Sequence, residues 1–230
     1  MNELLSQTVF FGIFITLISY QAGLWIKRRT KLALANPLLM AVIMIILFLL
    51  IFNVDYETYE KGADYISIFL TPATVSLAVP LYRRIELLRS YPKAIFAGIA
   101  AGVLTAMVSI FVMSLAFGLN HQEYVTLLPK SITTAIALGV SEKMGGIIGI
   151  TVVAVSITGI LGNIAAETIL KIFKIDEPIA KGLAIGTGAH ALGTSRAMEI
   201  GEIEGAMSSL SIVVAGIMTV IAVSVFALFI

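Results

Sequence analysis

The chain has no cysteine, two histidines and one tryptophan, and only 13% of its 230 residues are charged. The absence of cysteine excludes disulfides, thiol catalysis and thiolate-bound metals. A net charge of +1 argues against nucleic-acid binding. Soluble domains carry about 25% charged residues, whereas this chain is 59% hydrophobic. The composition therefore predicts an all-α integral membrane protein.

Apolar runs divide the chain into a polytopic bundle of about six to seven spanning segments, each needing about 20 residues. The uninterrupted runs cover 4–26, 32–52, 94–117, 147–172 and 206–229. Two further runs, at 65–82 and from Ile185 to Ala197, are interrupted by proline or glycine. We expect all of them to belong to one transmembrane domain, 1–230.

The stretch from Ile185 to Ala197, IGTGAHALGTSRA, carries three glycines, a histidine and an arginine in a very apolar context. Glycines weaken a helix, and a charge at membrane depth is costly without a partner or a cavity. The stretch therefore predicts a broken membrane helix. A second break is predicted at Thr71 to Thr74, around Pro72. Because irregular backbone must line protein or a water-filled cavity, we expect the two breaks to face each other.

An offset of 116 residues aligns Thr71 with Thr187 and carries the run at 94–117 onto the last one. Both halves then consist of a long helix, a broken segment, a polar linker and a long helix. This pattern predicts two repeats, 32–117 and 147–230, and is typical of transporters. The short apolar pieces of 119–146 predict a re-entrant hairpin between the repeats.

Positive charge sets the predicted orientation. Basic residues lie in 27–31, 83–93 and 171–181. All three groups are cytoplasmic only if 119–146 enters and leaves the membrane on one side. The two repeats are then inverted, the N-terminus and the acidic linker from Glu199 to Glu204 lie outside, and the C-terminus is cytoplasmic.

Broken helices present unpaired N–H groups and a partial positive charge, which suit a carboxylate or phosphate. Arg196 could clamp an anion with two hydrogen bonds, and His190 could couple its movement to a proton. Lys130 lies in a second cationic, hydroxyl-rich stretch. The predicted substrate-binding residues are Thr71, Pro72, Thr74, Lys130, Ser131, Thr134, Thr187, Gly188, His190, Thr194, Ser195 and Arg196.

Structural roles compete with these assignments. Arg196 could reach the membrane interface or pair with Glu199, and His190 could be a buried histidine bonded to a carbonyl group. Lys130 and Glu142 could form a structural pair. The sequence does not decide between these alternatives.

No catalytic motif is present, so we expect no enzyme, no cofactor and no metal site. Glu167 is best explained as an interfacial residue. Four glycines in the long runs predict close helix packing: Gly98, Gly102, Gly159 and Gly162.

Three segments resemble the LrgB/CidB family, which includes YohK-like proteins. They are LTPATVSLAVPLYRR (70–84), LPKSITTAIALGVSEKMGG (128–146) and GTGAHALGTSRAMEIGEIEGAMSSL (186–210). The resemblance covers essentially the whole chain. It implies a multi-pass protein of the bacterial inner membrane, related to antiholin-like regulators of murein hydrolase export and to the plastid glycolate/glycerate translocator. It supplies no binding residues.

The sequence and the resemblance together lead to two functional hypotheses. The first is a secondary transporter of small monocarboxylates such as glycolate, glycerate, pyruvate or lactate, which could be coupled to protons. The second is a holin- or antiholin-like protein that modulates cell lysis through partner contacts or a pore. Expected partners are a carboxylate anion, the lipid bilayer, an LrgA/CidA-type membrane protein and a second copy in a homodimer.

Overall fold

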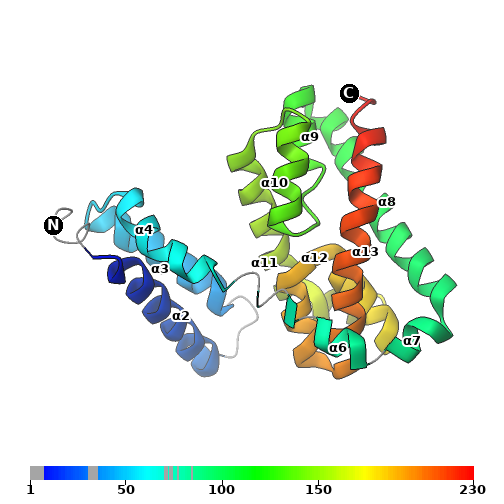
Figure 1. Cartoon of the computed structure of the whole chain (residues 1–230), viewed down its shortest axis with the longest axis horizontal. Coiled ribbons are helices and arrows are strands. Elements are labelled where there is room, and N and C mark those ends of the chain that lie inside the picture. Colours follow the sequence, from blue (N-terminus) through cyan, green and yellow to red (C-terminus); the bar gives the residue numbers. More distant parts are fainter. Residues whose placement is uncertain (1–7, 31–35, 70–71, 73–74, 77, 84) are drawn as a thin grey trace. The chain divides into compact units, whose positions relative to one another are not determined.

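The computed structural model describes residues 8–30, 36–69, 72, 75–76, 78–83 and 85–230, which contain helices and no strand (Figure 1). Within these residues four helices are long and apolar enough to cross a membrane: α2 (Phe10–Thr30), α8 (Pro92–Phe117), α11 (Ile148–Ile172) and α13 (Glu202–Phe226). The predicted all-helical membrane class is confirmed. The chain forms two compact units, Met1–Ser76 and Leu77–Ile230.

The first unit packs α2 against α3 (Pro37–Ile51) and α4 (Tyr56–Ser67). Its helices approach closely at glycines. A Cβ on Gly12 would lie 2.2 Å from the carbonyl oxygen of Tyr59, and one on Gly23 would lie 2.5 Å from that of Pro37. The Asn36 side chain caps α3 by accepting a hydrogen bond from the Leu38 amide at 2.9 Å.

The second unit contains the long helices α8, α11 and α13 and several shorter elements. These are α6 (Ala78–Arg83), α7 (Ile85–Ser90), α9 (His121–Leu127), α10 (Thr134–Lys143) and the interrupted helix α12 (Pro178–Ile200). Proline occupies the first turn of α8 and of α12, where its missing N–H costs nothing. Gly118 ends α8 with a left-handed φ of 66°.

The break predicted between Thr187 and His190 is confirmed. His190 has φ 42° and ψ −137°, which is not helical. A non-glycine residue with such a positive φ costs roughly 1–3 kcal/mol and persists only where its surroundings impose it. The packing of α12 therefore has to hold this backbone reversal in place.

The break folds α12 back on itself rather than kinking it. A Cβ on Gly193 would lie 3.0 Å from the carbonyl oxygen of Ile185, although eight residues of straight helix span about 12 Å. Ile185 and Ala197 also share one cluster of buried apolar side chains. The segments 178–189 and 191–200 thus form a helical hairpin, called the α12 hairpin, with His190 at its tip.

Close contacts fix the direction of each helix around this hairpin. Gly98 contacts Leu183, and Gly102 contacts Thr187. Because the residue numbers of the partners differ by 85 in both pairs, α8 runs parallel to the first half of α12. Gly182 contacts the backbone of Glu204, and Gly186 contacts that of Ser208. The offset is again constant, at 22 residues, so α13 is parallel to the same half.

Two sequence predictions are therefore wrong. The offset of 116 residues pairs α8 with α13, but these helices run in the same direction, whereas inverted repeats require opposite directions. The acidic linker from Glu199 to Glu204 also lies at the same end of α11 as the basic loop, because Ile200, Lys171 and Lys181 line one pocket. Both errors arise because α12 turns back at His190 instead of crossing.

The hairpin predicted over 119–146 corresponds to α9 and α10. It begins beside the end of α13, where the Tyr124 hydroxyl donates to the carbonyl of Phe226 at 3.0 Å. It returns to the same end, where the Ile147 amide donates to the Thr126 hydroxyl at 2.8 Å. In between, the α9–α10 hairpin descends along α11 until Ile132 packs against Val155.

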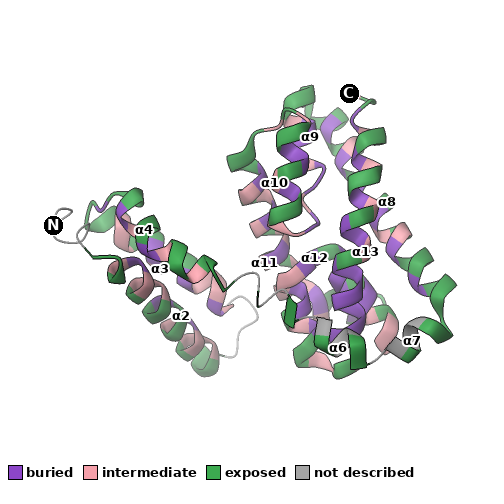
Figure 2. Ribbon diagram, viewed as in Figure 1, coloured by how far each residue is buried: buried purple, intermediate pink, exposed green. Residues whose placement is uncertain are grey.

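The core of the second unit lies where α12 and α13 pack together, which is the most extensively buried region in Figure 2. Residues 204–212 of α13 are all buried. Glycines in α12 bring the two helices into backbone contact, and glycines in α11 do the same for the α12 tip: a Cβ on Gly162 would lie 2.3 Å from that of Ala189. The packing role predicted for Gly98, Gly102, Gly159 and Gly162 is confirmed.

Gly186 and Gly188 provide a matched test of this packing. We expect Gly186→Ala to destabilise the protein by about 1–3 kcal/mol, because its Cβ would lie 2.4 Å from the backbone oxygen of Ser208. Gly188→Ala has no heavy atom within 4 Å of its Cβ and should not lower stability. Thermal unfolding in detergent measures both, and equal melting temperatures would contradict the proposed close approach of α12 and α13.

Candidate functional site

Lys130, at the turn of the α9–α10 hairpin, lines a cavity of about 420 Å³ together with Gly188 and Ala189 of α12. Thr158 and Gly162, near the middle of the 25-residue α11, line the same cavity. The α9–α10 hairpin comes from the end where α8 and α13 finish, and the α12 hairpin comes from the opposite end. The two hairpins thus meet about halfway along α11.

The ammonium group of Lys130 has little protein compensation. Its one polar contact in the described part of the chain is the Ser131 hydroxyl, 3.2 Å from Nζ. The structural pair with Glu142 considered from the sequence is not formed. A partly buried ammonium without a carboxylate partner favours an anion nearby, because desolvating an unpaired charge is costly. Two hydroxyl residues follow Lys130 closely in the chain. Ser131 is buried, and Thr134 is the first residue of α10.

His190 turns its ring towards α11. Its Nε2 donates a hydrogen bond to the carbonyl oxygen of Val155 at 3.1 Å, so the neutral ring carries its proton on Nε2. Gly159 makes room for the ring, because a Cβ there would lie 2.7 Å from Cε1. The ring is therefore a buried, carbonyl-bonded histidine, as the structural alternative stated. Its Nδ1 has no partner among the described residues.

Thr187 and Gly188 have different roles on α12. The Thr187 hydroxyl donates to the carbonyl of Leu183 at 2.7 Å, and its methyl group packs on Gly102 of α8. Thr187 is therefore a packing residue that also lines a second cavity between α8 and α12. Gly188 lines both this second cavity and the Lys130 cavity.

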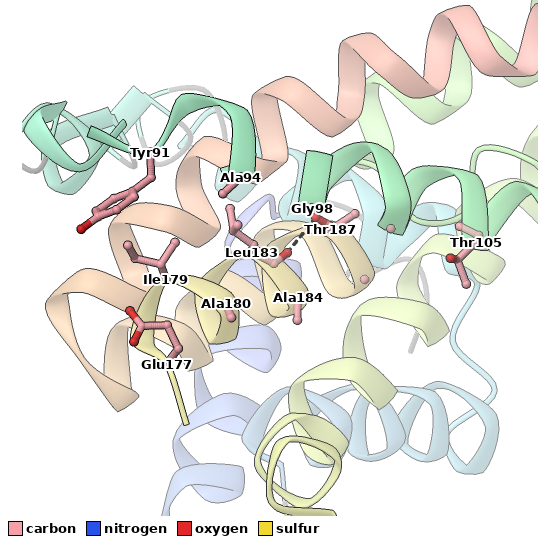
Figure 3. Close-up of a pocket in the computed structure, with 13 residues that line it drawn as sticks. Tyr91, Ala94, Gly98, Thr105, Glu177, Ile179, Ala180, Leu183, Ala184 and Thr187 are labelled. Carbon is pink, nitrogen blue, oxygen red and sulfur yellow. Dashed lines mark hydrogen bonds between the residues drawn. The ribbon is translucent and has the colours of Figure 1, made fainter. Parts of the chain in front are cut away.

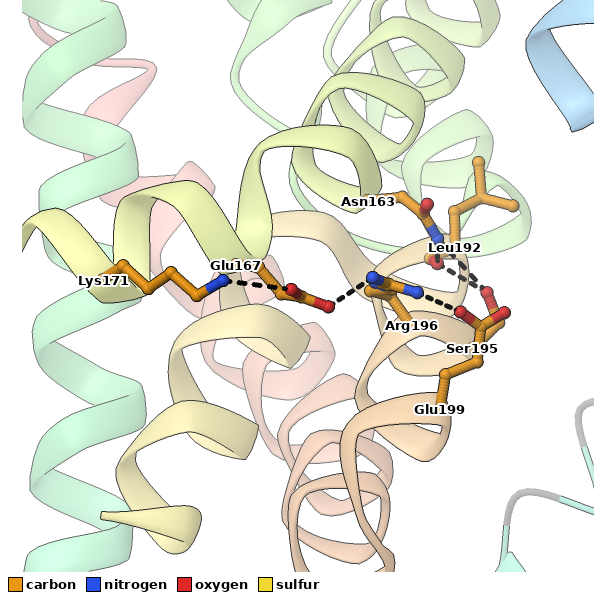
Figure 4. A network of polar contacts seen from close by, with 7 residues as sticks. All are labelled: Asn163, Glu167, Lys171, Leu192, Ser195, Arg196 and Glu199. Atoms are coloured by element: carbon orange, nitrogen blue, oxygen red, sulfur yellow. Dashed lines mark hydrogen bonds and ion pairs between the residues drawn. The ribbon is translucent and has the colours of Figure 1, made fainter. Parts of the chain in front are cut away.

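Arg196 lies between two carboxylates rather than at the Lys130 cavity (Figure 4). Its Nη1 donates to Glu199 and its Nη2 to Glu167. Lys171 extends the chain of charges, 3.7 Å from Glu167. The structure thus favours the pairing interpretation over the anion clamp. The network joins the base of the α12 hairpin to α11, and Glu167 is a structural partner rather than only an interfacial residue.

Thr194 and Ser195 hold the second half of α12. The Thr194 hydroxyl donates to the carbonyl of His190 at 3.0 Å, which leaves its oxygen to accept from the Ser208 hydroxyl at 2.7 Å. The exposed Ser195 hydroxyl donates to the carbonyl of Leu192 at 2.8 Å. Both side chains are engaged in shaping the hairpin, and neither lines the Lys130 cavity.

Asn163 of α11 is a residue that sequence reasoning missed. Its Nδ2 donates to the carbonyl of Leu192 at 2.6 Å and lies 3.4 Å from the Ser195 hydroxyl (Figure 4). It therefore ties the segment just after the break to α11. An asparagine inside a long apolar run was the signal that could have identified it.

The first predicted break falls largely outside the described residues. Thr71 and Thr74 are not described, and Pro72 is exposed and belongs to the first unit. The predicted meeting of the two breaks stays a prediction.

The LrgB-like family model matches residues 16–229 of the chain. Antiholin-like protein LrgB of Bacillus cereus (strain B4264) is 38% identical over 226 residues, covering 98% of both chains. Antiholin-like protein LrgB of Bacillus anthracis (strain CDC 684 / NRRL 3495) gives the same values. No solved structure matches the chain.

The Arg196 network should be measurable as an energetic coupling. Glu167→Gln and Arg196→Gln should each lower stability, and the double variant should lose less than the sum, with a coupling on the order of 1 kcal/mol. Unfolding in a denaturing detergent measures the cycle. Lys171→Gln is the control, because its side chain is 80% exposed and should contribute little. Strict additivity of the two changes would contradict the pairing.

Proposed function

Because the chain belongs to the LrgB-like family of membrane proteins, we propose that it is a secondary transporter of small monocarboxylates of the glycolate, glycerate, pyruvate or lactate type. It binds the anion between the tips of the α9–α10 and α12 hairpins. The observation that carries the proposal is the Lys130 ammonium, which faces the α12 tip across a shared cavity. The family is not known for enzymes.

The carboxylate lies against Lys130 in this proposal. The ammonium supplies the charge, and the neighbouring Ser131 and Thr158 hydroxyls supply short-range polar groups. The second half of α12 adds the unpaired N–H groups and partial positive charge of a helix start at the same depth. A volume of about 420 Å³ accommodates a small carboxylate with its remaining water. Arg196 has no direct role in binding.

Two hairpins from opposite ends that meet beside the middle of a spanning helix provide a physical basis for alternating access. Both hairpins are re-entrant in this proposal, and each one can cover the anion from its own side of the membrane. A static pore does not need two hairpin tips that lie at the same depth. The positive-inside rule places the end with Lys93, Lys171 and Lys181 in the cytoplasm, which puts the C-terminus outside, contrary to the sequence prediction.

The relatives are named antiholin-like, and an activity of that kind is the competing outcome. For either function, we propose that the protein is a homodimer in the bacterial inner membrane. Its proposed partner is an LrgA/CidA-type membrane protein. The two functions differ in one measurable property. A transporter saturates and selects among carboxylates, whereas a pore releases unrelated solutes of similar size.

Lys130 is the residue to change first. Lys130→Gln should lower the uptake of labelled glycolate or pyruvate into liposomes at least tenfold, because the anion loses its counter-charge, while Lys130→Arg should retain part of it. Lys143→Gln is the matched control, since Lys143 is an exposed lysine at the end of α10. Equal loss in both glutamine variants, or leakage of an unrelated dye by the unaltered protein, would reject the proposal.

We further propose that transport is coupled to a proton and that the Nδ1 atom of His190, which has no partner among the described residues, accepts it. We expect His190→Gln to keep a donor to the Val155 carbonyl but to lose the titratable ring. Uptake driven by the substrate gradient alone should persist, and its acceleration by an inward proton gradient should disappear. Measuring uptake with and without that gradient distinguishes the two. Acceleration that survives in the variant would show that another group carries the proton.

A further inference from the structure

A second cavity of about 780 Å³ lies between α8 and the first half of α12 (Figure 3). Tyr91 and Glu177 lie at one end of it and Thr105 at the other, with Leu183 and Ala184 between them. Tyr91 directly precedes α8 and Glu177 directly precedes α12. The end with Tyr91 and Glu177 is therefore also the end at which the α12 hairpin has its base.

The two cavities of this unit share part of their wall. Ala184 and Gly188 line both of them, and they lie one turn apart on the same face of α12. Both residues are exposed, whereas the three residues between them are buried. The first half of α12 thus presents one open face, with the larger cavity on its α8 side and the Lys130 cavity on its α11 side.

Gly188 lies on the wall that the two cavities share, and the space where its side chain would be is open. No heavy atom lies within 4 Å of a Cβ placed on it. A side chain at this position therefore begins in open space on the wall that the two cavities share. By contrast, Gly186 and Gly182 on the same helix lie in backbone contact with α13. The open position is thus specific to the wall that the cavities share.

We infer that the larger cavity is the vestibule through which the carboxylate enters and leaves the Lys130 cavity, and that Gly188 sets the size of substrate that passes. The inference rests on the proposed function. The vestibule opens to the cytoplasm, because its outer end is flanked by Lys93 and Lys181, beside Tyr91 and Ala180 in the chain.

The natural absence of cysteine makes the test direct. Ala184→Cys and Gly188→Cys each introduce one thiol into the chain. An anionic, membrane-impermeant methanethiosulfonate is applied to inside-out vesicles and to intact cells. We expect labelling from the cytoplasmic side, at least tenfold slower in saturating glycolate, and at least tenfold lower glycolate uptake once either thiol is labelled.

Gly149→Cys is the matched control. Gly149 is exposed, lies near the start of α11 at the opposite end, and has open space around its Cβ. Its thiol should be labelled from the outside, without protection by glycolate and without effect on uptake. Labelling at positions 184 and 188 that leaves uptake unchanged, or that occurs only from outside, overturns the vestibule.

A size series gives an independent readout. Gly188→Ala, Gly188→Val and Gly188→Leu should lower lactate uptake before glycolate uptake, because lactate is one methyl group larger. Equal loss for both acids overturns the size role of Gly188. The outcomes also separate the two proposals. If Lys130→Gln lowers uptake but thiol labelling does not, only the vestibule is rejected. If Lys130→Gln leaves uptake unchanged, the proposed function is rejected.

Discussion

The backbone reversal at His190 is the constraint on which the second unit depends. A positive φ at a histidine is unfavourable. A chain that reverses its direction inside a membrane also leaves backbone groups at the two helix ends without hydrogen-bond partners. The surrounding helices compensate both costs. Gly159 admits the imidazole ring, the Val155 carbonyl accepts a hydrogen bond from its Nε2, and Gly162 lets the tip lie against α11. Without these glycines α12 could not remain a hairpin, and no second tip would face Lys130.

The charges of this unit are distributed according to the same geometry. At the base of the α12 hairpin, Arg196 lies between Glu167 and Glu199, so its charge is neutralised by protein groups. At the meeting point of the tips, Lys130 has only a hydroxyl contact among the described residues. A paired cation stabilises the structure, whereas an unpaired one is available to a ligand. Only this comparison distinguishes the two cations, because the sequence offered a carboxylate partner to each of them, Glu199 to Arg196 and Glu142 to Lys130.

The sequence predicted the membrane class, the hairpin at 119–146, the break near His190 and the packing glycines. Each of these depends on a local property, such as apolar length, a short interrupted run, or a glycine in a helix. It could not predict that α12 folds back, because a broken spanning helix and a hairpin have the same composition. That difference is made by contacts that reach beyond one helical turn, such as those of Gly193 with Ile185 and of Asn163 with Leu192. The error in direction then carried over to the repeats and to the position of the acidic linker.

The helix directions suggest a different internal relation from the one based on the offset of 116 residues. The long helix α8 is followed by the α9–α10 hairpin, and the long helix α11 is followed by the α12 hairpin. The helices α8 and α11 run in opposite directions. The pair of α8 and its hairpin is therefore inverted with respect to the pair of α11 and its hairpin. Inversion of this kind brings a hairpin from each end to the same depth. It explains why Lys130 and Gly188 border one cavity although 57 residues separate them in the sequence.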